Sequence, residues 1–452
     1  MSETKLPTYL ADAKPNPMSN RAAWFKNTAP AYGGIILWFA FWNNIVNTGT
    51  PGGGLAYGII LPIITIIVAA LVAHFFFHLI PGLFGMKTGF GLAVVGSSVF
   101  GATGGTFMPG LLMGLLQFGW LAVNGYFSSI LIAGALPFAM PPWIIMVIFI
   151  ALAVFVGLKG IKYVAPISTY LPIIPVVVLV WLLVKTVGSV GSFDASEISA
   201  VAGAAPAISK FGITAYIVTY MIGFFATAGA AGVDFGTNSR DAKDVQLGGL
   251  VGVSLMMILT GVAAVVILAG AYGNPEYRAA LVASGASMDP TQIMGVVLGT
   301  NAGKICMGLL ALAAFPSACF ASLISANSFK TMLPKINSNI SVGIGGLAAV
   351  LLAVTGIAGD AGSVFGFIGA SFGPICGAMF VDYFMNGGKW TGPRAGFNIA
   401  GWLSWALGFT VGVLGILGMI PMGPIVAFIV GAVVYYGAMK AGLKTEVIPF
   451  NK

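Results

Sequence analysis

The amino-acid sequence predicts an all-α membrane protein with twelve transmembrane helices. Hydrophobic residues make up 58% of its 452 residues, and only 7% are charged. In soluble domains about a quarter of the residues are charged. With so few charged residues, a soluble fold of this chain could not hide its apolar surface from water. The apolar residues also form separate runs of about 20, the length that an α-helix needs to cross a bilayer. Lipid is therefore the expected solvent of most of this chain.

The predicted spans account for almost the whole sequence. None of the polar stretches between them is long enough to fold by itself, so we expect a tail at 1–30, a single transmembrane domain at 31–440 and a second tail at 441–452. The spans at 31–57 and 212–232 are the least regular in hydrophobicity. The twelve spans are 31–57, 58–84, 105–134, 141–158, 164–186, 212–232, 246–273, 300–326, 340–357, 362–384, 396–418 and 421–440.

The distribution of lysine and arginine predicts that both tails are cytoplasmic. Twelve spans with an internal N-terminus place 16 of the 20 basic residues inside and 4 outside, namely Lys185, Lys210, Arg278 and Lys304. Positive residues gather on the cytoplasmic side of membrane proteins, and a wrong number of spans would exchange the sides of the later loops and blur this ratio. We therefore expect a multi-pass protein of the inner (plasma) membrane.

Several classes of function are disfavoured. The net charge of +8 does not indicate a nucleic-acid partner, because the basic residues are scattered singly between apolar runs. The three cysteines lie inside apolar runs and are interpreted as packing residues. The first 30 residues lack the early apolar segment of a cleavable signal peptide. No metalloprotease, serine-hydrolase or Walker motif occurs, so we expect neither an enzyme nor a metal site.

Two spans carry residues that favour a break in the helix at mid-depth. We expect interruptions near Asn43–Gly49 in the first span and Phe225–Gly229 in the sixth, where glycines and small polar residues cluster. Unwound backbone is tolerated inside a membrane where it lines a cavity, and broken helices in corresponding halves mark the central site of a transporter. The alternative is that these glycines only allow neighbouring helices to pack closely.

Five short segments, taken in order along the chain, resemble motifs of the purine–cytosine permeases of the nucleobase–cation symporter class, nearest to bacterial cytosine permeases. The segments are 49–57 (GTPGGGLAY), 85–89 (GMKTG), 117–120 (QFGW), 223–243 and 382–386 (DYFMN). The resemblance covers most of the chain. It implies the LeuT-type fold, in which two inverted repeats of five helices are followed by two further helices. It also implies cation-coupled uptake of a nucleobase such as cytosine or a purine.

Helix eight departs from the pattern of this family. The family usually has a Thr/Ser pair and an asparagine-rich stretch there, which serve the cation and the base. Here the segment 314–322 reads AFPSACFAS, so Ser317 is the one hydroxyl that remains of the pair. The identity of the substrate and of the coupling ion, sodium or a proton, therefore stays open.

Gln117 and Trp120 are the strongest candidates for a substrate site. An amide in an apolar span must meet a partner or a cavity, because an unsatisfied amide in lipid costs several kcal/mol. The amide of Gln117 could pair with the edge of a planar base, and the rings of Trp120 and Phe225 could stack on its faces. The alternatives are a helix–helix hydrogen bond for Gln117 and ordinary packing for the rings. The full candidate set is Gln117, Trp120, Phe225, Thr227, Asn43 and Ser322.

Asn44 and Ser317 are the candidate cation ligands. Freed backbone carbonyls at the first break could join them, since oxygen ligands suit an alkali ion. Capping of the broken helix is the alternative for both Asn43 and Asn44. His74 and His78 lie four residues apart, which suits a proton relay or a metal pair, although Phe75–Phe77 between them suggest the membrane interface instead.

The sequence therefore predicts a secondary transporter for a small, neutral, planar heterocycle, with no cofactor other than a coupling ion. A LeuT-fold transporter of another small solute, such as an amino acid or a ureide, is the alternative. A channel is disfavoured because neither a repeated filter segment nor a ring of charges is visible. We expect lipid and a small-molecule substrate as partners, and a monomer or a weak oligomer.

Overall fold

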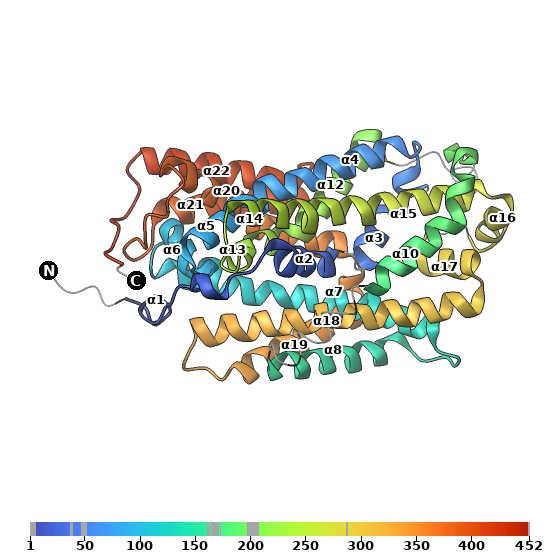
Figure 1. The fold of residues 1–452 in the computed structure, drawn as a ribbon, viewed down its shortest axis with the longest axis horizontal. Coiled ribbons are helices and arrows are strands. Elements are labelled where there is room, and N and C mark those ends of the chain that lie inside the picture. The colour runs from blue at the N-terminus through green and yellow to red at the C-terminus, as the bar shows by residue number, and fades with distance from the viewer. Residues whose placement is uncertain are drawn as a thin grey trace.

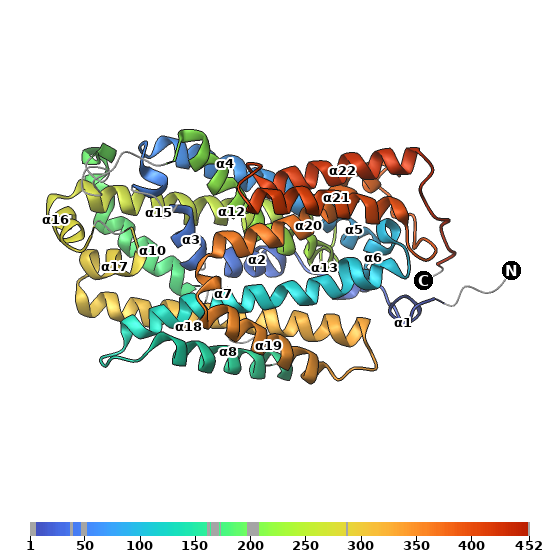
Figure 2. The same ribbon diagram turned by 180° about the vertical axis from the view of Figure 1, so that it is seen from behind.

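The computed structural model describes residues 6–36, 39–46, 52–160, 163, 171, 173–196, 208–285 and 288–450. Regular structure within these residues is helical, with two isolated β-bridges, Ala22–Ser239 and Arg394–Val447. The long helices run side by side along the longest axis of the molecule (Figure 1). Figure 2 shows from behind that α1 (Thr8–Ala11) lies at one end of this bundle, whereas α16 (Pro275–Ala283) and α17 (Pro290–Leu298) lie at the other.

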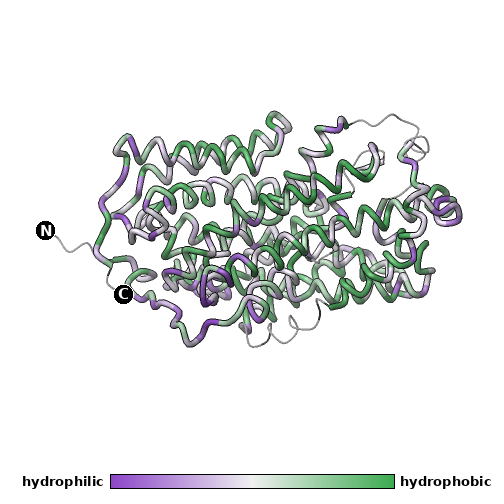
Figure 3. Tube along the Cα trace, turned by 45° about the horizontal axis from the view of Figure 1, so that its top comes forward, coloured by the Kyte–Doolittle hydropathy of each residue, from purple (hydrophilic) through white to green (hydrophobic). Residues whose placement is uncertain are grey.

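Nine helical segments of the described chain are long and apolar enough to cross a membrane, and two shorter apolar helices accompany them. Hydrophobic residues dominate these segments, and many of the hydrophilic residues lie in the connections (Figure 3). The helices are α4 (Ile60–Val72) with α5 (Leu79–Thr88), α7 (Leu112–Ala135), α8 (Pro142–Lys159), α10 (Ile173–Thr186), α12 (Lys210–Ala230), α14 (Ala242–Gly249) with α15 (Met256–Gly273), α18 (Thr300–Met332), α19 (Ser338–Val354), α20 (Ala361–Met385), α21 (Ile399–Ile416) and α22 (Gly423–Lys440).

The predicted spans from 58–84 onward each overlap one of these helices. The largest difference at a C-terminal end is in α18, which continues to Met332 although the prediction ended at 326. The span predicted at 164–186 is helical from Ile173 onward. The span predicted at 31–57 corresponds to two short helices, α2 (Thr28–Ile36) and α3 (Phe39–Val46), and residues 37–38 and 47–51 lie outside the described residues.

One face of α4 shows how the sequence suits lipid. Ile60, Ile64, Val68 and Leu71 recur every three or four residues and are all exposed at the surface of the molecule. The opposite face, which includes Ala69 and Ala70, is buried against the bundle. A continuous exposed apolar stripe of this kind is unfavourable in water and favourable against acyl chains.

The predicted interruption of the sixth span is wrong in its position. Residues Phe225–Gly229 are helical, because α12 continues to Ala230. The chain turns at Ala231 and resumes as the short helix α13 (Gly232–Gly236). The small residues before this turn serve close packing instead: a Cβ on Gly229 would lie 2.9 Å from Cβ of Phe77, and one on Gly223 would collide with the carbonyl of Phe365.

The predicted interruption of the first span is wrong over its first residues. Residues 43–46 are helical as part of α3. Residues 47–49, the remainder of the predicted break, lie outside the described residues. An asparagine pair does not by itself end a helix, since asparagine has only a moderately low helix propensity.

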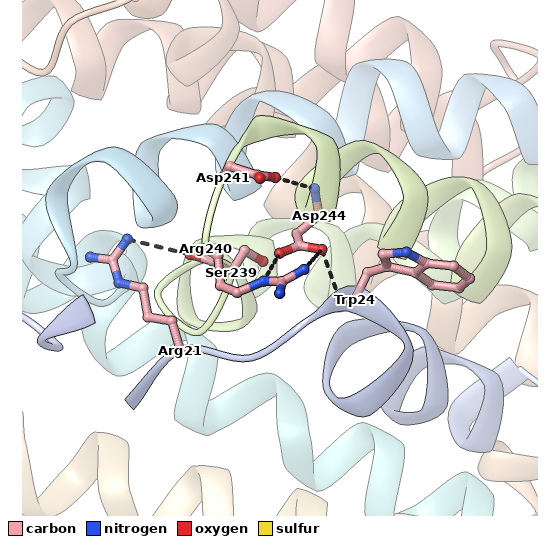
Figure 4. A network of polar contacts seen from close by, with 6 residues as sticks. All are labelled: Arg21, Trp24, Ser239, Arg240, Asp241 and Asp244. Carbon is pink, nitrogen blue, oxygen red and sulfur yellow. Dashed lines mark hydrogen bonds and ion pairs between the residues drawn. The ribbon is translucent and has the colours of Figure 1, made fainter. Parts of the chain in front are cut away.

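The N-terminal segment packs against the rest of the protein. Tyr9 donates a hydrogen bond to the carbonyl of Ala102 at 2.7 Å. Figure 4 shows the next contacts along the chain: Arg21 Nη1 lies 3.3 Å from the carbonyl of Ser239, and the backbone N–H of Trp24 donates to Asp244 Oδ1 at 3.1 Å. The carboxylate of Asp244 also accepts from Arg240 at 2.6 Å. The segment before α2 is therefore tied to the connection between α12 and α14.

Candidate substrate and ion site

A polar stripe on α7 forms the centre of the candidate site. Gln117, Trp120 and Asn124 follow one another at spacings of three and four residues, so they share one face of this helix. All three are buried, with 6%, 5% and 0% of their surface exposed. The neighbours of this face include α3, α12 and α20, which pack against α7 directly or through shared side chains.

Trp120 is held in place by a hydrogen bond and by two rings. Its indole Nε1–H donates to the hydroxyl of Thr227 on α12 at 3.0 Å. Its ring lies 4.7 Å from Phe224 and 4.8 Å from Phe365 of α20, measured between ring centroids. The pair with Phe224 is edge-on and the pair with Phe365 is tilted, and aromatic pairs at these distances are favourable beyond the area that they bury. The structure thus brings together two residues of the predicted set, Trp120 and Thr227.

Phe225 faces away from Trp120. Its ring packs 5.5 Å from that of Tyr32 on α2. The aromatic neighbour of Trp120 on α12 is Phe224, which the sequence analysis did not select. Helical spacing could have found it, because Thr227 shares a face with the residue three positions earlier and not with the residue two positions earlier. Phe365, also missed, lies in a distant helix, and no sequence spacing connects it to Trp120.

The amides of this stripe have unused hydrogen-bonding capacity. Gln117 Nε2 contacts the sulfur of Met113 on its own helix at 3.5 Å, and a thioether is a weak acceptor. Asn124 donates from Nδ2 to the carbonyl of Trp120 at 2.8 Å, while its Oδ1 is buried without a partner among the described residues. Asn124 is not among the residues predicted from the sequence, although a polar residue one turn after Trp120 in an apolar span is a readable signal.

Asn43 presents a second unused amide oxygen. Its Oδ1 is buried and has no hydrogen-bond partner in the described part of the chain. Its helix, α3, packs against α7, α12 and α20. Buried polar atoms are rarely left unpaired, and an orphaned acceptor in a transporter core is a place where a ligand or water can bind. The side chain of Asn44 lies outside the described residues.

The two serines of α18 lie apart from this stripe. Ser322 is fully buried, its hydroxyl lies 3.3 Å from the carbonyl of Ala318, and its Cβ approaches Gly157 of α8. It therefore borders α8, and the structure gives no contact between it and Trp120. Ser317 is half-buried next to Pro316. Ser325 of α18 donates to the carbonyl of Gly114 on α7, and Ser328 donates to the carbonyl of Gly110 in the turn that precedes α7.

A cavity of about 300 Å³ lies beside this region, between α12, α20 and the last two helices. Tyr220 lines it, and the ring of Tyr220 contacts Phe224 and Phe365, the rings that hold Trp120. Asp360 at its edge accepts a hydrogen bond from the backbone N–H of Ser363 at 3.1 Å and so caps α20. The aromatic cluster therefore connects this cavity to the candidate site.

A bundle of broken and continuous apolar helices around buried amides and rings defines a polytopic membrane transporter. The family model for permeases of cytosine and purines, uracil, thiamine and allantoin matches residues 17–437. The chain belongs to this family of permeases. No curated protein sequence matches it.

Solved structures share the fold of this chain. Mhp1, a nucleobase-cation-symport-1 family transporter, in a closed conformation with bromovinylhydantoin bound, is 17% identical, with a TM-score of 0.65 over 99% of this chain and 98% of that one. The inward-facing conformation of Mhp1 is 16% identical, with a TM-score of 0.67 over both whole chains. A Na⁺-coupled sialic acid symporter is 13% identical, with a TM-score of 0.58 over 99% of this chain and 94% of that one.

Proposed function

We propose that this permease is a secondary active transporter that imports a small, neutral, planar heterocycle together with a cation. The substrate would be a nucleobase such as cytosine or a purine, or a related compound. It would cross the membrane without being chemically converted. The observation that carries this proposal is the buried face of α7, on which Trp120 is preceded by the amide of Gln117 and followed by the amide of Asn124. An aromatic ring can stack on a flat heterocycle, and amides can match an edge that bears both donors and acceptors.

The family and the shared fold support this proposal. The family comprises permeases for cytosine and purines, uracil, thiamine and allantoin, which are small heterocycles. Mhp1 has been captured closed around a hydantoin and also facing inward, so that protein alternates between two conformations. A chain with the same fold is suited to alternating access, in which one repeat moves against the other around a central site.

The architecture that we propose has twelve spans, of which α2 and α3 together form the first. Helices one to five and six to ten would be inverted repeats, and α21 and α22 would be the additional pair. The turn at Ala231 between α12 and α13 supports a discontinuous sixth helix. In this arrangement both tails are cytoplasmic, the protein lies in the plasma membrane, and it functions as a monomer or a weak oligomer.

For the coupling ion we propose weak dependence on sodium, or coupling to protons in its place. The candidate ligands are Asn44 and Ser317, and α18 has one hydroxyl where the family usually has two, so a sodium site would have fewer protein oxygens. Uptake should change little when sodium is replaced by choline, and Ser317→Ala should abolish whatever sodium dependence remains. Steep sodium dependence that survives Ser317→Ala would show that the ion binds elsewhere.

A ureide or an amino acid is the alternative substrate class. The presence of allantoin in the family description favours a ureide. An amino acid would need its carboxylate met by a cation or by the N-terminus of a broken helix, where the helix dipole is positive. The turn at Ala231 supplies such a helix end, that of α13, but the residues named on α7 carry no charge that would pair with an ammonium group.

A ligand screen would test the substrate class. The thermal stability of the purified full-length protein would be measured with cytosine, uracil, adenine, allantoin, hydantoin and phenylalanine, each with and without sodium. A ligand that binds only the folded state raises the unfolding temperature in proportion to its saturation. We expect a flat heterocycle to stabilise the parent protein and not Trp120→Ala, while Trp143→Phe, a change at an exposed residue at the start of α8, keeps the response. Stabilisation by phenylalanine alone would refute the proposal.

A further inference from the structure

Two buried histidines lie on the other side of α12 from Trp120. His74 and His78 belong to a π-helical turn, Ala73–His78, between α4 and α5, and both are fully buried. A Cβ on Gly249 of α14 would collide with both imidazole rings, so this glycine leaves the space that they occupy. Gly232 does the same at the start of α13, where a Cβ would lie 3.1 Å from His78 Nδ1. Both imidazole rings are therefore enclosed between helices, and a buried polar ring nitrogen is unfavourable unless it has a hydrogen-bond partner.

The hydrogen-bond partners of His78 determine which protons it carries. The hydroxyl of Tyr32 on α2 lies 2.9 Å from the carbonyl oxygen of Ala228 and 3.0 Å from His78 Nδ1. We assign the single hydroxyl proton to Ala228, whose carbonyl oxygen can only accept, and with this assignment Nδ1 donates to the Tyr32 oxygen. On the other side, Nε2 lies 3.4 Å from the carbonyl oxygen of Val245, which also can only accept. Only the doubly protonated imidazolium donates from both nitrogens and satisfies all three contacts.

We infer that His78, Tyr32 and the carbonyls of Ala228 and Val245 form a proton-binding site that couples proton movement to transport. This inference rests on the proposed symport function and names its coupling ion. Ala228 lies in the last turn of α12, directly before the turn at Ala231, and Val245 lies in α14. Binding of the proton strengthens contacts that hold α2, α12 and α14 to the π-helical turn. Release of the proton removes a donor from one of these contacts and frees the helices to separate.

His74 is the neighbour and not the site. Its ring centroid lies 5.7 Å from that of His78, and both of its nitrogens are buried without a hydrogen-bond partner among the described residues. Nothing stabilises a charge on His74, and a charge on His78 would repel one there. The pair therefore carries one positive charge, on His78, while His74 stays a neutral imidazole.

Other titratable groups lie on three of the helices near the site, α13, α14 and α20. Asp234 of α13 and Cys376 of α20 are titratable groups near Tyr32. Asp244 lies on the same helix as Val245, but its carboxylate is bound by Arg240 and by the backbone N–H of Trp24. Any dependence on pH must consequently be assigned by comparing His78 with His74 and Asp234.

The experiment compares His78→Gln with three variants: His74→Gln, Asp234→Asn and Tyr32→Phe. The full-length protein is reconstituted into vesicles that contain a pH-sensitive dye, and cytosine, uracil, allantoin and hydantoin are added in turn. We expect the parent, His74→Gln and Asp234→Asn to acidify the vesicle interior as the ligand enters. His78→Gln should still exchange labelled ligand for unlabelled ligand across the membrane but should lose this acidification. Tyr32→Phe, which keeps the ring and removes the bridging hydroxyl, should show a smaller loss in the same direction.

If vesicles with His78→Gln acidify as much as vesicles with the parent, the proton site is overturned. It is also overturned if the parent accumulates ligand only when sodium is present and the vesicle interior does not acidify. If none of the four ligands enters the parent, the proposed function fails and a measurement without ligand decides on the proton site. The unfolding temperatures of the parent and of His78→Gln are then compared between about pH 5 and 8, the range in which histidine changes charge. The site predicts that the parent gains stability over His78→Gln toward the acidic end, and an equal difference across the range refutes it. If His78→Gln does not fold, Tyr32→Phe provides both measurements.

Discussion

The two faces of α12 differ although neighbouring residues supply them. Phe224 and Thr227 face α7 and hold the ring of Trp120. Phe225 and Ala228 face α2, where they contact the ring and the hydroxyl of Tyr32. The first face offers rings and amides without charge, and the second offers an imidazole among carbonyl oxygens. One helix can thus connect a site for a flat neutral molecule to a site for a proton, because a movement of α12 alters both.

The largest effect that tests this difference is expected from Trp120→Ala. The change removes the stacking surface and the donor to Thr227. Stacking of a base on an aromatic ring is worth about 1–3 kcal/mol, or roughly tenfold to a hundredfold in affinity. Calorimetric titration with the ligand found in the screen measures the loss. Trp143→Phe is the control, and unchanged affinity in a folded Trp120→Ala protein would place the pocket elsewhere.

Loss of an amide should have a similar or slightly smaller effect. In Gln117→Ala the polar edge of the bound heterocycle would lose a partner, which costs on the order of 1–3 kcal/mol when that edge is buried. Asn124→Ala should weaken binding less, because Asn124 Nδ2 is already engaged with the carbonyl of Trp120. Equilibrium binding of labelled ligand compares both variants with the parent. Equal affinity in all three proteins would mean that these amides serve helix packing only.

The two adjacent phenylalanines provide a direct comparison of the two faces. Phe224→Leu removes an edge-on ring contact with Trp120, and such contacts contribute about 0.5–1.5 kcal/mol. We expect a loss of affinity of up to about tenfold. Phe225→Leu should leave ligand affinity unchanged, because its ring packs on Tyr32. Binding measured on both purified variants checks this, and a larger loss in Phe225→Leu would favour the original selection of Phe225 from the sequence.

The sequence was informative where hydrophobicity alone decides the structure. Runs of apolar residues located the helices from Ile60 onward, and a lone amide in such a run pointed to Gln117. Helical spacing from Thr227 favours Phe224 over Phe225 and was overlooked. The rotation of a helix about its axis depends on packing with distant helices, so the contact of Phe365 with Trp120 and the position of Ser322 against α8 were not readable. The interruption of the sixth span was predicted at Phe225–Gly229, before the turn at Ala231, because small residues permit both close packing and unwinding. Arg21 and Asn16 donate to the backbone carbonyls of Met86 and Thr237. Every residue has a backbone carbonyl, so the sequence could not indicate these partners.

The smallest effect is expected at Asp234, which lies in α13 just beyond the membrane-spanning residues Lys210–Ala230 of α12. Its Oδ1 accepts a hydrogen bond from the backbone N–H of Leu92 at 3.2 Å, at the start of α6 (Leu92–Phe100). The surrounding protein removes water from the carboxyl group and raises its pKa from 3.8 to about 6, although the residue keeps an exposed surface. The folded state therefore binds the proton of the Asp234 carboxyl group more tightly than the unfolded state does. The stability of the protein consequently falls as the pH rises from about 4 to about 6.

Asp234→Asn replaces the carboxylate with a neutral group that can still accept from Leu92. The variant should unfold at a higher temperature than the parent at neutral pH, and the difference should disappear below about pH 4, where the parent carboxyl is protonated in both states. Because the residue is partly exposed, we expect a shift of small size. Thermal unfolding of both proteins in the same detergent across this range measures it. A variant that is less stable than the parent at neutral pH would show that the folded state needs the negative charge of Asp234.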